Sequence, residues 1–186
     1  TDKLEEYLHS NKVIVMQTAP AVRVSLGEEF GMKLGTNVEG KMITALRTIG
    51  ADYVFDTTFG ADLTVMEEAS ELVNRIKTSK NLPMFTSCCP SWVKFCEMFY
   101  PEYLDNLSTC KSPISMMGSV INNYFCKINN LKREDIISIV IVPCTNKKME
   151  ILRYNDNDLA INTKELAKYL KKEKINLEKL KNSSYN

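Results

Sequence analysis

A chain of 186 residues is long enough to fold as one domain with a substantial core, and 44% hydrophobic with 25% charged residues is typical of a globular protein. The formal net charge of +1 excludes the strongly basic surface that nucleic acid or anionic lipid would attract. No apolar segment approaches the roughly 20 residues of a membrane-spanning helix. We therefore expect neither nucleic acid nor a membrane as a partner.

The N-terminus and the cysteines bear on the cellular compartment. Thr1-Asp2-Lys3 has neither an initiator methionine nor a charged-then-apolar signal segment. Six cysteines without a secretion signal favour reduced thiols or metal ligands over disulfides. We therefore expect a cytoplasmic protein, and a chain that was cut from a longer one.

Four short apolar segments predict β-strands, and a helical pattern follows each of them. The first and the last are near-continuous runs of β-branched residues, as in strands buried on both faces. Alternating strands and helices indicate βαβ units, so we predict a single α/β domain over residues 1–186 with about four mostly parallel strands. The predicted strands are Lys12–Thr18, Tyr53–Thr57, Met84–Ser87 and Ile136–Val142.

Capping residues predict where the helices begin and end. Thr36 and Glu39 have the spacing of a capping box, and Gly50 would end that helix. Asp62 is predicted to cap a second helix and Thr163 a last one. The predicted core positions of these three helices are Met42, Ile43, Leu46 and Ile49, then Leu63, Met66, Val73 and Ile76, then Leu166, Ala167 and Leu170.

Two prolines predict the start of the remaining helices. Pro90 and Pro113 suit a first helical turn, where the missing N–H costs nothing. The lysine-rich stretch from Lys164 to Lys181 alternates with glutamates, which favours a solvated amphipathic helix over a binding patch.

The residues that could bind a ligand or react lie at the carboxyl ends of the predicted strands. In open parallel sheets, ligands bind at these ends. Two cysteine segments from distant parts of the sequence would therefore meet at one edge of the sheet. The residues expected at that edge are Ala19-Pro20, Thr57-Thr58, Cys88-Cys89 and Pro143-Cys144.

Adjacent cysteines before a helix form a candidate metal or redox site. The positive end of a helix dipole favours thiolate, the form that binds metal, and Pro90 places Cys88 and Cys89 there. Cys144 follows a strand in the same way, with two lysines just beyond it. The alternative is that the cysteines are small core hydrophobes. That alternative is favoured for Cys96, Cys110 and Cys126.

Two motifs make a resemblance to a known family specific. Thr86-Ser87-Cys88-Cys89-Pro90-Ser91-Trp92 and Pro143-Cys144-Thr145-Asn146-Lys147-Lys148 are similar to the first two signature motifs of iron-only hydrogenases, and the resemblance covers residues 12 to 175. It implies the first lobe of the hydrogenase catalytic fold. Further agreement is found in Ala19–Arg23 with Gly27–Gly31, in Ala61–Thr64 with Met66–Glu68, and in Leu107–Ser108 with Lys111–Pro113.

The resemblance implies an H-cluster, in which a cubane 4Fe–4S cluster is joined to a di-iron site that carries CO and cyanide. Such a cofactor interconverts protons, electrons and hydrogen, with ferredoxin or a similar carrier as electron partner. By resemblance, Cys89 and Cys144 would be cubane ligands. Lys147 would face a cyanide, and Ala19 and Pro20 would line the same pocket.

The resemblance also implies a route for protons. Cys88 would not bind iron but would hand protons to the di-iron site as a thiol acid and base. Glu68 and Glu71 share a helix face, and with Ser108 they would relay protons from the surface. Arg75 lies one turn beyond Glu71 and is placed to pair with it. If the family resemblance is set aside, the simpler interpretation is that Glu68 and Glu71 are solvent-exposed residues of a helix.

Two positions depart from the family pattern. Ile114 stands where several members have glutamine, and Val142 stands where many have methionine. Both would alter the surroundings of the cofactor and not its ligands, so we expect them to tune it.

The resemblance covers only half of a cluster site. A cubane needs four ligands, and two motif cysteines are present. In the family, the other two come from a third motif, E-x-M-x-C-x-x-G-C-x-x-G-G, in a second lobe that is absent from this sequence. We expect the chain alone to be inactive and to be a fragment, a split subunit or a degenerate relative. Its partner would be the missing lobe, in cis or on another chain.

Three functions remain open from the sequence. The first is hydrogenase, in the cytoplasm or, in a eukaryote, in the hydrogenosome. The second is a non-catalytic 4Fe–4S protein like the hydrogenase-related cytosolic cluster-assembly proteins, which typically lack the residues matching Cys88 and Lys147. The presence of both residues here favours the enzyme. The third is a flavodoxin-like module without metal.

Overall fold

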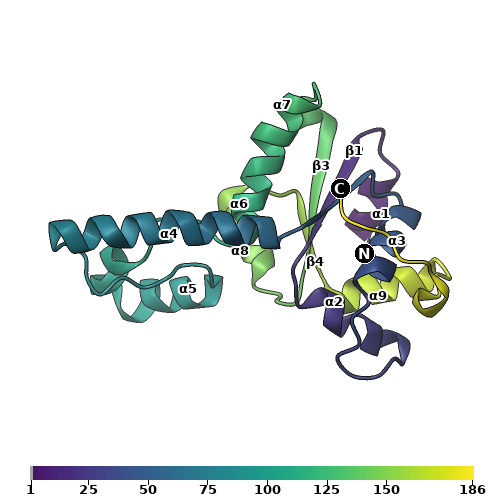
Figure 1. Cartoon of the computed structure of the whole chain (residues 1–186), viewed down its shortest axis with the longest axis horizontal. Coiled ribbons are helices and arrows are strands. Elements are labelled where there is room, and N and C mark those ends of the chain that lie inside the picture. The colour runs from purple at the N-terminus through teal and green to yellow at the C-terminus, as the bar shows by residue number, and fades with distance from the viewer. Residues whose placement is uncertain (1) are drawn as a thin grey trace.

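The fold is built on a four-stranded parallel sheet with the strand order β2-β1-β3-β4. The structure is a computed structural model that describes residues 2–186. Ile139 of β3 lies opposite Met16 of β1, and Ile141 lies opposite Ile161 of β4. The predicted α/β class with a parallel four-stranded sheet is confirmed (Figure 1). The strands are β1 (Val13–Thr18), β2 (Tyr53–Asp56), β3 (Ile136–Val142) and β4 (Leu159–Asn162).

Helices cover both faces of the sheet because the central strands are apolar on both sides. Ile139 and Ile141 of β3 pack into one core with Met16, whereas Val140 and Val142 pack into a core on the other face. Every residue of β3 is buried, as its near-continuous apolar sequence predicts. The first face is covered by α1 (Asp2–Leu8), α3 (Glu39–Thr48) and α9 (Thr163–Lys172), and the second by α6 (Pro113–Val120) and α8 (Lys147–Tyr154).

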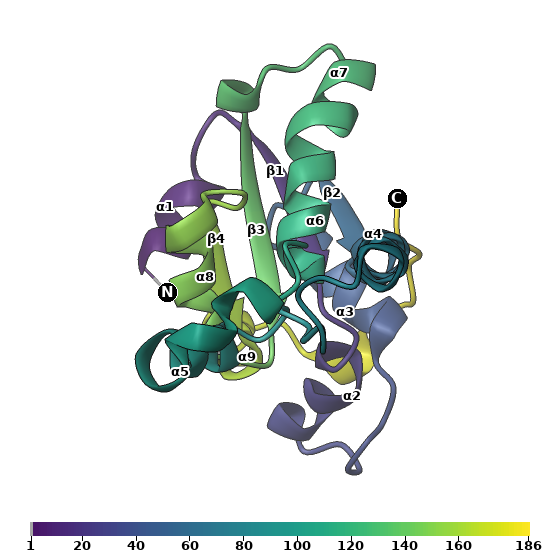
Figure 2. The ribbon, with the colours of Figure 1, turned by 90° about the vertical axis from the view of Figure 1, so that its left-hand side faces the viewer.

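Two helices form an arm that extends away from the sheet. The long helix α4 (Thr58–Thr78) leaves the sheet at its first turns, with α5 (Pro90–Phe99) below it (Figure 1). Figure 2 shows α4 end-on beside α6. The two helices approach closely at Gly60, where a Cβ would lie 2.9 Å from Met117 Cβ and would also meet the Pro113 carbonyl oxygen.

The remaining helical segments are short. No helix within residues 2–186 is long and apolar enough to cross a membrane. The short segments are α2 (Val22–Ser25), α7 (Cys126–Ile128), a π-helical turn at Ile121–Phe125, and 3-10 turns at Gly27–Phe30, Pro101–Asn106, Arg133–Asp135 and Leu177–Lys179.

One predicted strand is wrong, and one strand is missing from the prediction. Met84–Ser87 lies in the arm, where Phe85 forms only an isolated bridge with Leu107. The Phe85 ring packs on Trp92 and Tyr103, so its apolar character serves an aromatic cluster and not the sheet. The fourth strand is instead β4, whose four residues follow a polar turn and are too short to give a periodic signal.

The predicted helix caps are displaced from their true positions. Glu39 is the first residue of α3, and the Asn37 side chain accepts its N–H at 2.9 Å in place of Thr36. Likewise, α4 begins at Thr58, whose N–H is accepted by Asp56 at 3.0 Å, so Asp62 lies inside the helix.

The last helix is capped one residue earlier than predicted. Asn162 accepts the N–H of Glu165 at 2.9 Å, and the Glu165 carboxylate accepts the N–H of Asn162 at 2.8 Å. Thr163 is therefore the first helical residue of α9. Its predicted core residues Leu166 and Leu170 are fully buried.

The predicted core face of α4 is also wrong. Met66, Val73 and Ile76 are exposed, because the helix runs outward along the arm and only its first turns reach the sheet. The predicted helix starts at Pro90 and Pro113 are confirmed, since these residues begin α5 and α6. The predicted helix end at Gly50 is also confirmed, because Gly50 follows α3 with a φ of 113°.

Candidate functional site

The strand order creates a crevice at the carboxyl ends of β1 and β3. From β1 the chain continues to β2 on one side, whereas β3 and β4 lie on the other side. The segments after β1 and β3 therefore diverge at a topological switch point, the place where open α/β sheets bind ligands. Ala19 donates its N–H to the Ile141 carbonyl oxygen at 2.9 Å. Ala19 is half-buried and Pro20 exposed, and Pro143-Cys144 follows β3 at the same edge.

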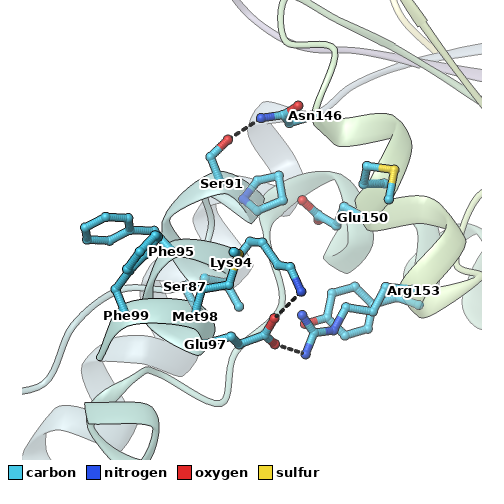
Figure 3. Close-up of a pocket in the computed structure, with 14 residues that line it drawn as sticks. Ser87, Ser91, Lys94, Phe95, Glu97, Met98, Phe99, Asn146, Glu150 and Arg153 are labelled. Carbon is cyan, nitrogen blue, oxygen red and sulfur yellow. Dashed lines mark hydrogen bonds and ion pairs between the residues drawn. The ribbon is translucent and has the colours of Figure 1, made fainter. Parts of the chain in front are cut away.

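The segment with Cys88 and Cys89 reaches this edge from the arm and not from a strand. The Lys147 ammonium donates to the Cys88 carbonyl oxygen at 2.6 Å. The Asn146 amide also donates to the Ser91 hydroxyl, and Figure 3 shows this second link between α5 and the segment that precedes α8. The prediction that the two cysteine motifs lie next to each other is confirmed. The predicted strand before Cys88 is wrong.

Three cysteines of the motifs are exposed free thiols: Cys88, Cys89 and Cys144. Cys89 is the N-cap of α5 and has an extended backbone, with Pro90 at the first helical position. This position puts Cys89 at the positive, N-terminal end of the α5 dipole. The arrangement has the chemistry of a soft-metal site, because thiolates are the preferred ligands of iron–sulfur clusters.

The other cysteines have different surroundings. Cys96 and Cys126 are buried in the core, as predicted. Cys110 is half-buried, and burial raises the pKa of its thiol, with further increases from the negative charges of Glu68, Glu67 and Glu71. Burial likewise raises the pKa of the Cys126 thiol.

Lys147 is held by a carboxylate that the sequence did not single out. Its ammonium donates to Glu150 Oε2 at 2.6 Å, and Glu150 is only 4% exposed. Glu150 also accepts hydrogen bonds from the hydroxyls of Ser112 and Ser115. A glutamate three residues after a lysine on one helix is a recognisable pairing signal, but nothing in the sequence indicates that this one is buried.

The predicted proton-relay residues are partly brought together. Ser108 donates its hydroxyl to Glu71 Oε2 at 2.7 Å, and Arg75 pairs with Glu71 Oε1 at 2.7 Å, so the expected ion pair is present. Burial raises the pKa of Glu71, but hydrogen bonds from Ser108, Arg75 and the Thr109 N–H outweigh it and lower the pKa.

Glu68 is less tightly placed. It lies one turn before Glu71 on α4 and is half-buried, but no hydrogen bond joins it to Ser108 or Cys88 within the part of the chain that the structure describes. Its negative charge contributes to the raised pKa of the Cys110 thiol. Ser87 donates to the Cys110 carbonyl oxygen at 2.7 Å, and this bond ties the cysteine motif to that segment.

A cavity of about 560 Å³ lies between α5 and α8, beside the two motifs (Figure 3). Its sides are mainly apolar, with Phe95, Met98 and Met149 among the lining residues. The ion pair between Arg153 and Glu97, at 2.6 Å, spans the two helices. The cavity therefore adjoins the candidate site but contributes no further thiol.

The donor set fits half of a cubane cluster. Cys89 and Cys144 supply the right kind of ligand, whereas a cubane takes four. Within residues 2–186, no three His, Cys, Asp or Glu side chains gather in a group that could hold a metal ion. The two thiols are therefore suitable ligands but do not form a complete set.

Comparison with known families settles the relationship. The profile of the family described as "Iron only hydrogenase large subunit, C-terminal domain" matches residues 12–186. The chain belongs to this family. The predicted resemblance is confirmed, and its range extends slightly beyond the residues on which it was based.

Individual relatives agree with this family membership. The chain is 44% identical to iron hydrogenase 1 of Clostridium pasteurianum over 190 residues, which cover 98% of this chain and 33% of the relative. It is 31% identical to the cytosolic Fe-S cluster assembly factor narfl of Xenopus tropicalis, covering 90% of this chain and 38% of that protein. The chain thus spans about a third of the length of these relatives.

The fold agrees with solved hydrogenase structures. A variant of the [FeFe]-hydrogenase HydA1 from Chlamydomonas reinhardtii superposes with a TM-score of 0.95 and 34% identity, covering all of this chain and 50% of that one. The four-stranded lobe described above is therefore part of the iron-only hydrogenase fold.

Proposed function

We propose that this chain is the first lobe of the catalytic domain of an iron-only hydrogenase and contributes half of its H-cluster site. The hydrogen bond from Lys147 to Cys88, at 2.6 Å, carries the proposal. It brings the two cysteine motifs together beside the switch point of a parallel sheet, where ligands bind. A flavodoxin-like module without metal gives no reason for a contact between two segments that each carry exposed thiols.

Each cysteine of the motifs has a separate role in the proposal. Cys89 and Cys144 bind the cubane, while Cys88 remains a free thiol beside the di-iron site. The bound cofactor supplies the chemistry of reversible hydrogen oxidation and proton reduction. Lys147 presents its ammonium to an anionic cyanide. Ala19 and Pro20, at the end of β1, line the same pocket and exclude water from it.

The arm supplies the route for protons. Arg75 fixes Glu71 at the outer end, and Glu71 and Ser108 share a hydrogen bond of 2.7 Å along which a proton can pass. Glu68 is the next carboxylate toward the cysteine motif, and Cys88 is the final acid and base. In this account, water bound to the half-buried Glu68 completes the hydrogen-bonded chain.

Two further cubane ligands must come from a second lobe, in cis or on another chain. This requirement follows from the two thiols of the motifs and the four ligands that the cluster takes. The electron partner is ferredoxin or a similar carrier. The chain alone is inactive in this account, because its share of the site is incomplete.

Infrared spectroscopy tests this function. The complete protein, with its cofactor assembled under anaerobic conditions, should show CO and cyanide stretching bands. A protein that binds stoichiometric iron but shows neither band is not a hydrogenase.

A role in iron–sulfur cluster assembly or sensing is the second candidate, and the 31% identity to narfl supports it. In that case the protein would hold a cubane without a di-iron site. Bound iron without the CO and cyanide bands would favour this candidate. The absence of iron from the anaerobically prepared complete protein would exclude both.

A further inference from the structure

Glu150 is a buried carboxylate at the edge of the candidate site. Its side chain is only 4% exposed. Among residues 2–186, the other buried charged side chains are Arg75 and Asp156. A buried carboxylate requires hydrogen-bond donors or a cation, so the partners of Glu150 define what it does.

Glu150 is held from two sides. Its Oε1 accepts hydrogen bonds from the Ser115 hydroxyl, at 3.1 Å, and from the Ser112 hydroxyl. Both serines are fully buried at the start of α6, a different element from the α8 helix that carries Glu150. Its Oε2 accepts from the Lys147 ammonium at 2.6 Å. The carboxylate is thus fixed by α6 independently of Lys147. We therefore take Glu150 as the fixed partner that orients the flexible Lys147 side chain.

The second bond of Lys147 sets its direction. A lysine ammonium has three N–H donors on a flexible stem. Glu150 takes one, and the Cys88 carbonyl oxygen takes another at 2.6 Å. These two acceptors hold the ammonium against the cysteine motif and leave one donor for a further acceptor. Lys147 is 16% exposed as a result.

The neighbouring lysine provides a natural comparison. Lys148 pairs with Glu165 and is 40% exposed, and Glu165 itself is 33% exposed. The two adjacent lysines therefore have similar partners but different burial. Only the Lys147 pair reaches the cysteine motif.

We propose that Glu150 is a positioning residue, which fixes the Lys147 ammonium beside Cys88 so that its remaining N–H faces an anionic ligand bound there. This inference rests on the proposed function, in which that ligand is a cyanide of the di-iron site. The bonds from Ser112 and Ser115 make the arrangement present before any ligand binds.

Amine acylation of the cluster-free chain tests the positioning by itself. Acetic anhydride is applied to the wild-type chain and to Glu150→Gln, and peptide mass spectrometry follows Lys147 and Lys148 separately. The variant should acylate Lys147 at least about tenfold faster, since a charge-assisted hydrogen bond is lost, while Lys148 keeps its rate. Glu97→Gln, which removes a carboxylate from the Arg153 pair, is the matched control and should leave both rates unchanged.

The result that overturns the proposal is an unchanged Lys147 rate in a folded Glu150→Gln chain. Circular dichroism establishes the fold. If that variant does not fold, Ser115→Ala replaces it, because the carboxylate then loses one of its fixing donors, and Lys147 should again acylate faster. An unchanged rate in folded Ser115→Ala would equally overturn the proposal.

Infrared spectra of the assembled protein test the direction in which Lys147 points. Glu150→Gln should move the cyanide bands in the same sense as Lys147→Met, and Glu97→Gln should not move them. Cyanide bands that Glu150→Gln leaves in place would contradict the positioning role. If the wild-type protein has no cyanide band, the proposed function fails, while the acylation result still decides whether Glu150 positions Lys147.

Discussion

The Lys147 ammonium on α8 lies 2.6 Å from the carbonyl oxygen of Cys88, although 59 residues separate them along the chain. This bond joins the segment after β3 to the segment before α5. The bond between Asn146 and Ser91 joins the same two segments a second time. Two cysteine motifs therefore form one surface, although only one of them follows a strand of the sheet.

Replacement of the free thiol should separate proton delivery from cluster binding. In the complete, cofactor-loaded protein, Cys88→Ala should retain the iron of the wild type and reduce hydrogen production by about 10²-fold or more, because the last acid and base is lost. Iron analysis and a hydrogen assay measure the two effects. Cys110→Ala is the control and should keep both. Loss of iron from Cys88→Ala would mean that this thiol is a ligand.

The stability of the chain should depend on pH through Glu71. Its folded pKa lies below the usual value of about 4.3, so the charged carboxylate stabilises the fold above that value. This contribution is lost as the pH falls through the folded pKa. Urea denaturation should show a higher free energy of unfolding for the wild type than for Glu71→Gln at pH 6, with a smaller difference at pH 3. A difference that stays constant between these pH values would contradict the assignment.

Arg75 should be important for the stability of the arm. Its guanidinium pairs with Glu71 and donates to the carbonyl oxygens of Asn81, Asp105, Asn106 and Leu107. Arg75→Met leaves the half-buried Glu71 carboxylate without its counter-charge and removes one donor from each of these carbonyls, so the free energy of unfolding should fall by about 3–5 kcal/mol.

An exposed arginine provides the matched comparison. Arg153 is 52% exposed and pairs with Glu97 across the cavity, so Arg153→Met should cost no more than about 1 kcal/mol. Thermal or urea denaturation measures both variants. Equal losses in the two would show that Arg75 does not hold the arm together.

The contact between α4 and α6 should tolerate no side chain at position 60. A Cβ there would meet the Pro113 carbonyl oxygen and lie 2.9 Å from Met117 Cβ. Gly60→Ala should therefore destabilise the fold by about 1–3 kcal/mol, although alanine is the better helix former. Ala69→Gly, on the exposed outer part of α4, should cost about 1 kcal/mol from propensity alone. A more stable Gly60→Ala chain would contradict the close approach.

The sequence predicted the buried parts of the fold better than the arm. β1 and β3 are near-continuous apolar runs, and the sheet buries them on both faces, so pattern and structure agree. β4 has only four residues and pairs with β3 alone, which leaves little periodicity to detect. Met84–Ser87 resembles a strand in composition, but its Phe85 side chain packs on aromatic rings of the arm and not against the sheet.

Residues of the candidate site could be predicted from sequence where they belong to a short motif or a helix spacing. Residues whose role comes from tertiary contacts could not. The ion pair of Glu71 with Arg75 follows from helix spacing, and the structure contains it. Glu150 has the same kind of spacing from Lys147, but its importance comes from burial against α6, which no local pattern reveals. The meeting of the two cysteine motifs was predicted correctly from a wrong premise, a strand before Cys88.

Iron stoichiometry in ligand variants tests the central claim most directly. The complete protein is loaded anaerobically as wild type, Cys89→Ala, Cys144→Ala and Cys110→Ala, and the bound iron is measured for each. If both motifs contribute ligands to one cubane, Cys89→Ala and Cys144→Ala should each lose the cluster, while Cys110→Ala should keep the wild-type iron content. Wild-type iron in either Cys89→Ala or Cys144→Ala would contradict a shared cluster site.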